Sequence, residues 1–291
     1  MGSTVEDQHL AKGTDVRALS SYPAGVPCWI DTAQPDPAAA ADFYGGLFGW
    51  KLTEAAPGYL VATMEGSPVG AITAAAGDTS APGWTTYVRV DDADTAVKAI
   101  EAAGGRRLLG PVEHPGAGRR AVCADPDGAT FGVVQTAGPL VALRVNEPGT
   151  WNFSELQTPD IERAIAFYRE AFGWQSGPVD MGFGETWMVR RPGYGDVLEQ
   201  HRPGTKANHL AFGAPPGFTD AVAWIGPRSD PAAAPQWHLT FAVDDADDMT
   251  ARAVDLGGTV LSEPVDAGVV RMAVLRDPHG VAFTVSRFDP S

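Results

Sequence analysis

Two carboxylates at equivalent places in this sequence could exchange protons with a ligand. Asp31 and Glu155 are 155 − 31 = 124 residues apart, and the segments around them repeat at that spacing. Each follows an aromatic residue by two positions, Trp29 or Phe153, so that in a strand the ring and the carboxylate share one face. Aromatic neighbours desolvate a carboxylate and raise its pKa towards neutrality. Either residue could therefore act as an acid or base, or instead make a structural hydrogen bond to a neighbouring loop.

Other residues could contact or transform a ligand beside these carboxylates. His201 and His209 lie on or between expected strands of the second half, where each could take part in proton transfer or be a hydrogen-bonded surface histidine. Flat aromatic side chains could form apolar walls or simply core. We expect a role in ligand binding for Trp29, Tyr87, Phe153, Trp187 and His201, and core positions for Trp50 and Trp174.

The composition favours a globular protein with an uncharged or weakly charged small ligand. The chain has 291 residues, 44% of them hydrophobic, and a formal net charge of −15. It has no basic run that could follow a phosphate backbone, so nucleic acid and membrane surfaces are not expected partners. Cys28 and Cys123 lack the spacing of a zinc site or disulfide framework. Without an apolar leader or a long apolar run, we expect a cytoplasmic protein with a flexible N-terminal arm, residues 1–25.

An internal repeat organises the rest of the chain. The segment from Phe43 to Trp50 recurs 124 residues later, from Phe167 to Trp174. The sequence Val-Asp-Asp-Ala-Asp at 90–94 recurs 153 residues later at 243–247, so the second copy contains 153 − 124 = 29 additional residues. The Pro-, Gly- and Ala-rich stretch at 213–235 is expected to hold part of this insertion.

The repeated pattern predicts an α+β fold built from tandem βαβββ units. Helices are expected after Asp36 and Asp160, which can cap them, and each ends at a glycine. The first copy is expected to have strands at 29–33, 59–64, 69–74, 85–90, 106–109, 119–124 and 129–135, of which 59–64, 69–74 and 85–90 would form a β-meander. The turn Asp125-Pro126-Asp127-Gly128 separates the last two. We assign a first module to 26–137, a linker to 138–150 and a second module to 151–288.

These repeated landmarks resemble the vicinal oxygen chelate superfamily, which includes glyoxalase I, bleomycin-resistance proteins and extradiol dioxygenases. The resemblance covers residues 26–288 and rests on the two Phe-Tyr helices, the Phe-Gly-Trp segments and the two Asp-Pro-x-Gly turns. It implies two modules with curved open sheets that pack with pseudo-twofold symmetry, each sheet having a concave, ligand-facing side. It also implies similarity to two-module actinobacterial members that occur with antibiotic and aromatic polyketide pathways.

The same resemblance places the family's metal-ligand positions in this sequence. In the first module these are Trp29, Thr85 and Gly132, and in the second they are Phe153, His238 and Thr284. One histidine in six positions does not form a chelating site, so no metal and no other cofactor is expected. His238 could remain as a general acid or base, or as a wall residue that contacts the ligand.

The sequence therefore leads to two hypotheses and a weaker third. The first is a metal-independent enzyme that carries out a dehydration, cyclisation or epimerisation of a hydrophobic polycyclic natural product, with Asp31, Glu155, His209 and His238 as its acid/base groups. The second is a non-catalytic protein that sequesters a drug and so confers resistance. The third is an interaction protein with a vestigial pocket. The expected partner is a small aromatic ligand, bound by a monomer or weak homodimer.

Overall fold

The computed structural model describes residues 22–75, 82–114, 118–136, 141–180, 185–228 and 230–289. Most of the expected N-terminal arm lies outside these described residues. Each half of the repeat forms one eight-stranded mixed sheet, and we call the halves the first and second modules. No helix in the described ranges is long and apolar enough to cross a membrane.

The first sheet has the strand order β2-β3-β4-β1-β5-β8-β7-β6. Its central strands β1 and β5 are antiparallel, and each has a parallel outer neighbour, β4 or β8. This is the arrangement of two βαβββ units joined through their first strands. In chain order the elements are β1 (Pro27–Gln34), α1 (Pro37–Phe48), β2 (Lys51–Ala56), β3 (Tyr59–Met64), β4 (Ser67–Ala74), β5 (Gly83–Arg89), α2 (Ala93–Ala102), β6 (Arg106–His114), β7 (Gly118–Ala124) and β8 (Thr130–Gln135).

The second sheet repeats this order as β10-β11-β12-β9-β13-β16-β15-β14. The expected α+β fold with tandem βαβββ units is thereby confirmed. Its elements are β9 (Trp151–Thr158), α3 (Ile161–Phe172), β10 (Gln175–Asp180), β11 (Glu185–Arg190), α4 (Tyr194–His201), α5 (Thr205–Ala211), η2 (Phe218–Asp220), β12 (Ala221–Pro227), β13 (Gln236–Ala242), α6 (Ala246–Asp255), β14 (Thr259–Ala267), β15 (Val270–Arg276) and β16 (Ala282–Phe288).

The ends of α1 and α3 follow from their sequences. The Asp36 side chain accepts hydrogen bonds from the backbone N–H groups of Ala38 and Ala39, and Asp160 caps α3 in the same way through Arg163. Gly49 ends α1 with φ at 74°, a left-handed conformation that favours glycine. The expected limits of both helices are confirmed.

The strands of the first module differ from the expected ones in two respects. The strand β2 was not expected, because this edge strand is mostly exposed and lacks the alternation of apolar and polar residues that marks a half-buried strand. The segment at 85–90 does not continue a meander from β3 and β4. It is β5, which pairs with β1 and β8, while β2, β3 and β4 form the meander.

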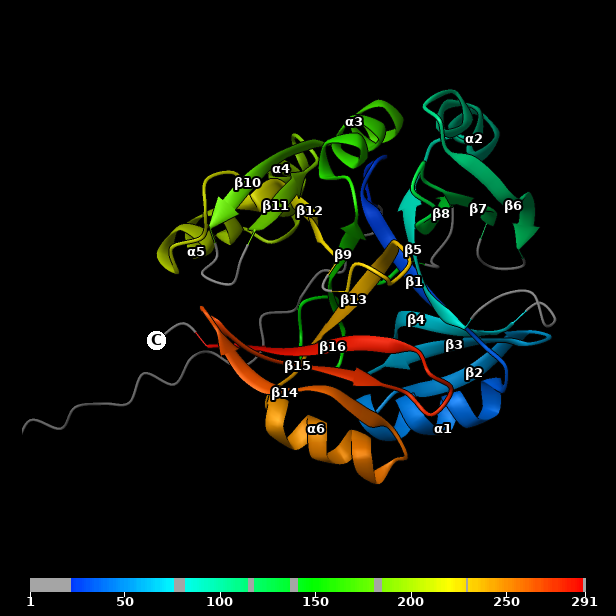
Figure 1. Cartoon of the computed structure of the whole chain (residues 1–291), viewed down its shortest axis with the longest axis vertical. Helices are drawn as coiled ribbons and strands as arrows, with labels where there is room; N and C mark the ends of the chain where they lie inside the picture. Colours follow the sequence, from blue (N-terminus) through cyan, green and yellow to red (C-terminus); the bar gives the residue numbers. More distant parts are fainter. Residues whose placement is uncertain are drawn as a thin grey trace, which may run out of the picture.

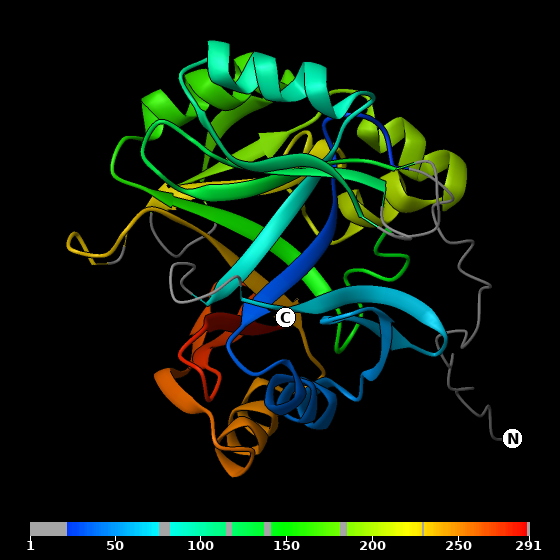
Figure 2. The same cartoon turned by 90° about the vertical axis from the view of Figure 1, so that its right-hand side faces the viewer.

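The two modules pack against each other at both ends of the molecule. Figures 1 and 2 show α1 beside α6 at one end and α2 beside α3 at the other. The Tyr44 hydroxyl donates to Asp277 at 2.9 Å, and the Tyr168 hydroxyl donates to Asp125 at 3.2 Å. Each Asp-Pro-x-Gly turn therefore binds the Phe-Tyr helix of the other module, and the expected pseudo-twofold packing is confirmed.

The extra residues of the second module form one continuous insertion between β11 and β12. We call residues 191–220 the inserted segment; it contains α4, α5 and η2. Its ends meet where the Arg191 N–H donates to the Asp220 carbonyl at 2.9 Å. The stretch at 213–235 contributes only its first part to this segment, and its remainder forms β12 and the connection to β13, because Ala221 to Pro227 pairs with β9 and β11.

Candidate functional site

A cavity of about 770 Å³ lies on one face of the second sheet, under the inserted segment. This volume is within the range of small-molecule sites. The strands β9, β12, β13, β15 and β16 contribute residues to its floor, and α4, α5 and η2 contribute residues to its cover. Its lining includes Phe153, Glu155, Tyr194, Arg202, His209, Phe212, Phe218, Trp224, Thr240, Met272, Thr284 and Phe288.

Aromatic rings form a connected wall of this cavity. Phe153 of β9 lies 5.8 Å from the ring of Trp224 and 6.1 Å from that of Phe218. Phe218 in turn lies 5.1 Å from the imidazole ring of His209. The contacts therefore run from the floor of the sheet to the inserted segment, and they provide flat apolar surfaces suited to an aromatic ligand.

Glu155 is the buried carboxyl group of the cavity floor. It is two residues from Phe153 on β9, and its strand neighbours are Trp224 on one side and His238 on the other. Burial raises the pKa of Glu155, while a hydrogen bond from Gln157 to its Oε2 at 3.4 Å acts in the opposite direction. The environment therefore favours the protonated acid, a form that can donate a proton to a ligand.

His209 faces the same cavity from the opposite side, on α5. Burial lowers its pKa and so favours the neutral imidazole. Its Nδ1 atom is buried and has no hydrogen-bond partner in the ranges that the structure describes. A neutral ring nitrogen of this kind is available to accept a proton from a ligand.

His238 lies on the floor strand β13, below the surface of the cavity. Its Nε2 atom is 2.8 Å from the hydroxyl of Thr284, which lines the cavity. Burial lowers the pKa of His238 to about 4, so that the ring is neutral near neutral pH. It is not among the lining residues itself, and its hydrogen bond helps to position the Thr284 hydroxyl.

The depressed pKa of His238 predicts a loss of stability in acid. Unfolding restores a pKa of about 6.5, so the unfolded chain binds the proton more tightly between pH 6.5 and 4. The difference of about 2.5 between the two pKa values of His238 corresponds to about 3 kcal/mol of unfolding free energy. This contribution is present above pH 6.5 and lost by pH 4. Urea unfolding of His238→Gln should lack this part of the pH dependence, whereas His201→Gln should retain it. Equal slopes for wild type and His238→Gln would contradict the assignment.

The corresponding face of the first module is filled by its own side chains. Arg120 Nη1 lies 3.3 Å from Asp31 Oδ2 and donates to the Tyr59 hydroxyl at 2.9 Å. The guanidinium group also lies 4.9 Å from the ring centre of Tyr87. Burial raises the pKa of Asp31 to about 6, and the charge of Arg120 acts in the opposite direction. Asp31 therefore belongs to a buried ion pair in the other module, away from the cavity.

Side-chain size explains how the first module fills space that belongs to the cavity in the second module. In the first module Tyr87 is paired with Gly132, and a Cβ atom on Gly132 would come within 2.1 Å of the Tyr87 ring. The equivalent pair in the second module is Thr240 with Thr284. A threonine thus occupies the place of the large ring, and the space that Tyr87 fills in one module remains open in the other.

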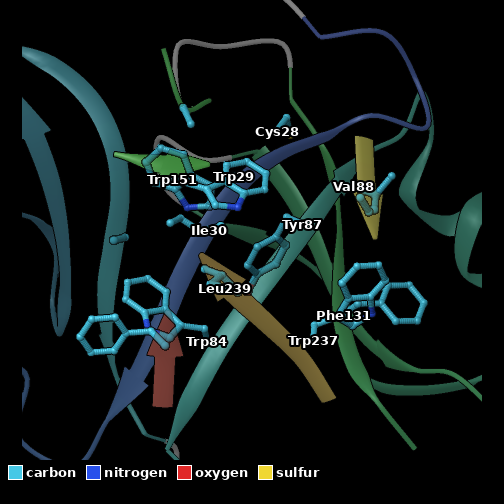
Figure 3. Packing of buried hydrophobic residues seen from close by; sticks show 14 of the residues in the cluster. Cys28, Trp29, Ile30, Trp84, Tyr87, Val88, Phe131, Trp151, Trp237 and Leu239 are labelled. Carbon is cyan, nitrogen blue, oxygen red and sulfur yellow. The ribbon is translucent and has the colours of Figure 1, made fainter. Parts of the chain in front are cut away.

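The remaining expected site residues lie outside the cavity lining. Trp29 is fully buried in the first module, where its Nε1 donates to the Tyr59 hydroxyl at 3.0 Å, and Tyr87 is 6% exposed (Figure 3). Trp187 packs against the hydrophobic core from β11, and its strand neighbours Thr186 and Met188 point to the other face. His201 ends α4 in the connection between β11 and β12, and it is not among the residues that line the cavity.

The structure also adds residues that the sequence analysis did not single out. Trp224 is on β12, whereas Tyr194, Arg202, Phe212 and Phe218 are on the inserted segment or directly beside its helices. The signal that could have identified them was the insertion itself, since a long addition to one of two repeats that contains several aromatic residues is a candidate cover for a pocket.

The residues of the second module do not fit a metal of the kind that this fold holds in other proteins. At the three positions, Phe153 has no donor atom, and the hydroxyl of Thr284 is engaged with the only imidazole, that of His238. Among the described residues there is no group of three or more His, Cys, Asp or Glu side chains that could hold a metal ion. The donor set is therefore too small for a chelating site.

Both modules match known protein families. Residues 29–133 match the family described as Glyoxalase/Bleomycin resistance protein/Dioxygenase superfamily, and residues 154–286 match the one described as Glyoxalase-like domain. Among solved structures, a Mn(II)-bound glyoxalase from Novosphingobium aromaticivorans has a TM-score of 0.58 at 15% identity, with 91% of this chain and 82% of that chain covered. At this identity the likeness supports the fold alone.

Two curated proteins are similar over almost the whole chain. One, named putative glyoxylase CFP32, from Mycobacterium bovis, is 34% identical over 283 residues, which cover 93% of this chain and 98% of that protein. The other, named anthracycline biosynthesis protein DauV, from Streptomyces sp. strain C5, is 36% identical over 285 residues, which cover 92% and 94%. The similarity therefore includes both modules and the segment between them.

Proposed function

Because the chain is a two-module member of the vicinal oxygen chelate superfamily, we propose that its second module binds a polycyclic aromatic natural product and carries out acid/base chemistry on it. The observation that carries this proposal is that Glu155 and His209 line the same aromatic cavity. A cavity that only sequesters a ligand needs shape and burial, whereas an acid/base enzyme also needs proton-transfer groups within reach. The similarity to a protein named for anthracycline biosynthesis supports an aromatic polyketide as the ligand class.

The two groups have complementary protonation states. Glu155 in the floor is favoured as the acid, and His209 in the cover is favoured as the base. His209 would accept a proton from a C–H or O–H group of the ligand while Glu155 delivers one to an oxygen or carbon on the other side. In a dehydration the protonated oxygen leaves as water, and in an epimerisation the carbon loses a proton from one face and gains one on the other. The Thr284 hydroxyl, held by His238, can hydrogen-bond a ligand oxygen.

The proposal that the ligand binds in this cavity is tested by filling the cavity with the side-chain pair that the first module has at the equivalent positions. The double substitution Thr240→Tyr with Thr284→Gly reproduces the pair Tyr87 and Gly132, so the new ring should occupy the ligand space. Binding of a planar probe, anthraquinone-2-carboxamide, should weaken at least tenfold, a loss of about 1.4 kcal/mol or more. Calorimetry on this variant and on Thr284→Gly alone checks the expectation, since the single variant only enlarges the cavity. Unchanged affinity in the double variant would place the ligand elsewhere.

Removal of divalent cations is expected to leave binding and turnover unchanged. The reason is the small donor set, in which His238 is the only imidazole at the family's ligand positions in the second module. The measurement compares chelator-treated and untreated protein in ligand titrations and product assays, with metal content determined by mass spectrometry. Stoichiometric zinc, iron, nickel or manganese whose removal abolishes activity would contradict metal independence.

The rival function is sequestration of a drug without turnover, which the apolar lining of the cavity also favours. The two functions differ in what becomes of the bound molecule. Chromatography of candidate aromatic polyketides after incubation with the protein distinguishes them. Tight binding with every ligand returned unchanged favours the sequestering protein.

A further inference from the structure

The inserted segment brings one cationic side chain towards the cavity besides the neutral imidazole of His209. Arg202 follows α4 and lines the cavity beside Tyr22 and Tyr194. Burial raises the pKa of both tyrosine hydroxyls, and the positive charge of Arg202 acts in the opposite direction. The guanidinium group therefore lies close enough to both phenols for its charge to affect them.

No carboxylate in the described ranges neutralises this cation. Arg202 forms no ion pair there, and its Nε atom is buried without a hydrogen-bond partner. The other arginine of the lining, Arg287, lies 3.4 Å from Asp289. Asp244 is exposed, and the pKa of Glu155 is set by burial and Gln157 rather than by a neighbouring cation. A buried guanidinium N–H without a partner is costly unless a ligand satisfies it.

We propose that Arg202 binds an anionic carboxylate substituent of the polycyclic aromatic ligand, so that the site selects acidic over neutral members of this ligand class. A guanidinium group matches a carboxylate with two parallel hydrogen bonds. The unpartnered Nδ1 of His209 lies in the same cover and can contact another oxygen-bearing part of the ring system. This inference rests on the proposed function, because it assumes that the cavity binds an aromatic polycycle.

The test compares two probes that have the same ring system and nearly the same shape, anthraquinone-2-carboxylate and anthraquinone-2-carboxamide. Wild-type protein should bind the carboxylate about 10–100-fold more tightly, as expected for a charge-assisted hydrogen-bonded pair in a partly buried site. Arg202→Met should remove this preference and leave the affinity for the carboxamide within about twofold. Arg202→Lys should retain only part of the preference, because an ammonium group lacks the planar fork.

Arg228→Met is the matched control, since Arg228 also has a buried Nε atom without a partner but does not line the cavity. It should keep the full preference for the carboxylate. If the wild type binds both probes with equal affinity, Arg202 does not favour an anionic ligand and the inference is wrong. The proposed aromatic site is not affected by this result. An equal loss of affinity for both probes in Arg202→Met, with a normal thermal unfolding curve, also overturns the inference, because Arg202 would then contribute only to the shape of the cavity. Failure of both probes to bind wild type overturns the proposed function itself.

Discussion

Replacing Glu155 with Gln is expected to slow turnover about 10²–10⁴-fold, the usual contribution of a general acid. The amide has nearly the same size and keeps the hydrogen bond with Gln157, but it cannot deliver a proton. Affinity for the ligand should change little, because the aromatic rings around Glu155 remain in place. Product formation and calorimetric binding must be measured on the same preparation, so that a loss of chemistry is separated from a loss of binding.

The pH profile gives an independent readout of the same assignment. Activity should fall on the high-pH side of the profile as Glu155 loses its proton and on the low-pH side as His209 gains one, because the first must be protonated and the second neutral. Glu155→Gln should abolish the high-pH limb of the residual rate, and His209→Gln the low-pH limb. Glu170→Gln is the matched control, since this exposed glutamate of α3 undergoes the same chemical change away from the cavity. A wild-type rate in Glu155→Gln would exclude this residue as the acid.

The fold could be predicted from the sequence because the repeat carries its own landmarks. The caps at Asp36 and Asp160, the glycines that end α1 and α3 and the two Asp-Pro-x-Gly turns are local features, and local features can be read without knowing the tertiary structure. The inter-module role of Asp125 and Asp277 could not be read in this way, because their tyrosine partners are 43 and 233 residues distant.

The site was harder to predict because equivalent positions in the two modules have different surroundings. Asp31 and Glu155 are related by the repeat, yet Asp31 is paired with Arg120 while Glu155 lines a cavity. The difference arises from neighbouring side chains, since Tyr87 stands where the second module has Thr240, and Arg120 packs against Tyr87 and Asp31. Strand alternation identifies the face on which a residue lies, but it does not tell which face is filled.

The helices that cover the cavity are a second reason why the site was hard to predict. His209 was expected on a strand or in the connection between two strands, and it lies in the connection between β11 and β12, on the helix α5. The sequence predicted the size of the insertion but not its helices, because α4 and α5 are short and pack against each other and η2, and helices of this length are marginal without such packing.

Breaking the buried ion pair between Arg120 and Asp31 of the first module is expected to have a second large effect, a loss of stability. Replacing Arg120 with Met leaves the carboxylate of Asp31 in an apolar environment, where both side chains are now at most 6% exposed. The loss of one partner of a buried ion pair typically costs about 3–5 kcal/mol of unfolding free energy. The loss should be greater at pH 8 than at pH 5. Burial already raises the pKa of Asp31 to about 6, and without Arg120 it rises further, so at pH 5 the acid is protonated in both proteins.

Urea unfolding at both pH values checks this expectation, and two further variants identify its cause. Asp31→Asn combined with Arg120→Met should recover most of the stability at pH 8, because no unpaired charge then remains buried. Arg119→Met should have a much smaller effect, since its pair with Asp94 is largely exposed to solvent. If Asp31→Asn also leaves ligand turnover at the wild-type rate, then Asp31 stabilises the first module and takes no part in the chemistry. A turnover loss comparable to that of Glu155→Gln would instead restore Asp31 as a catalytic candidate.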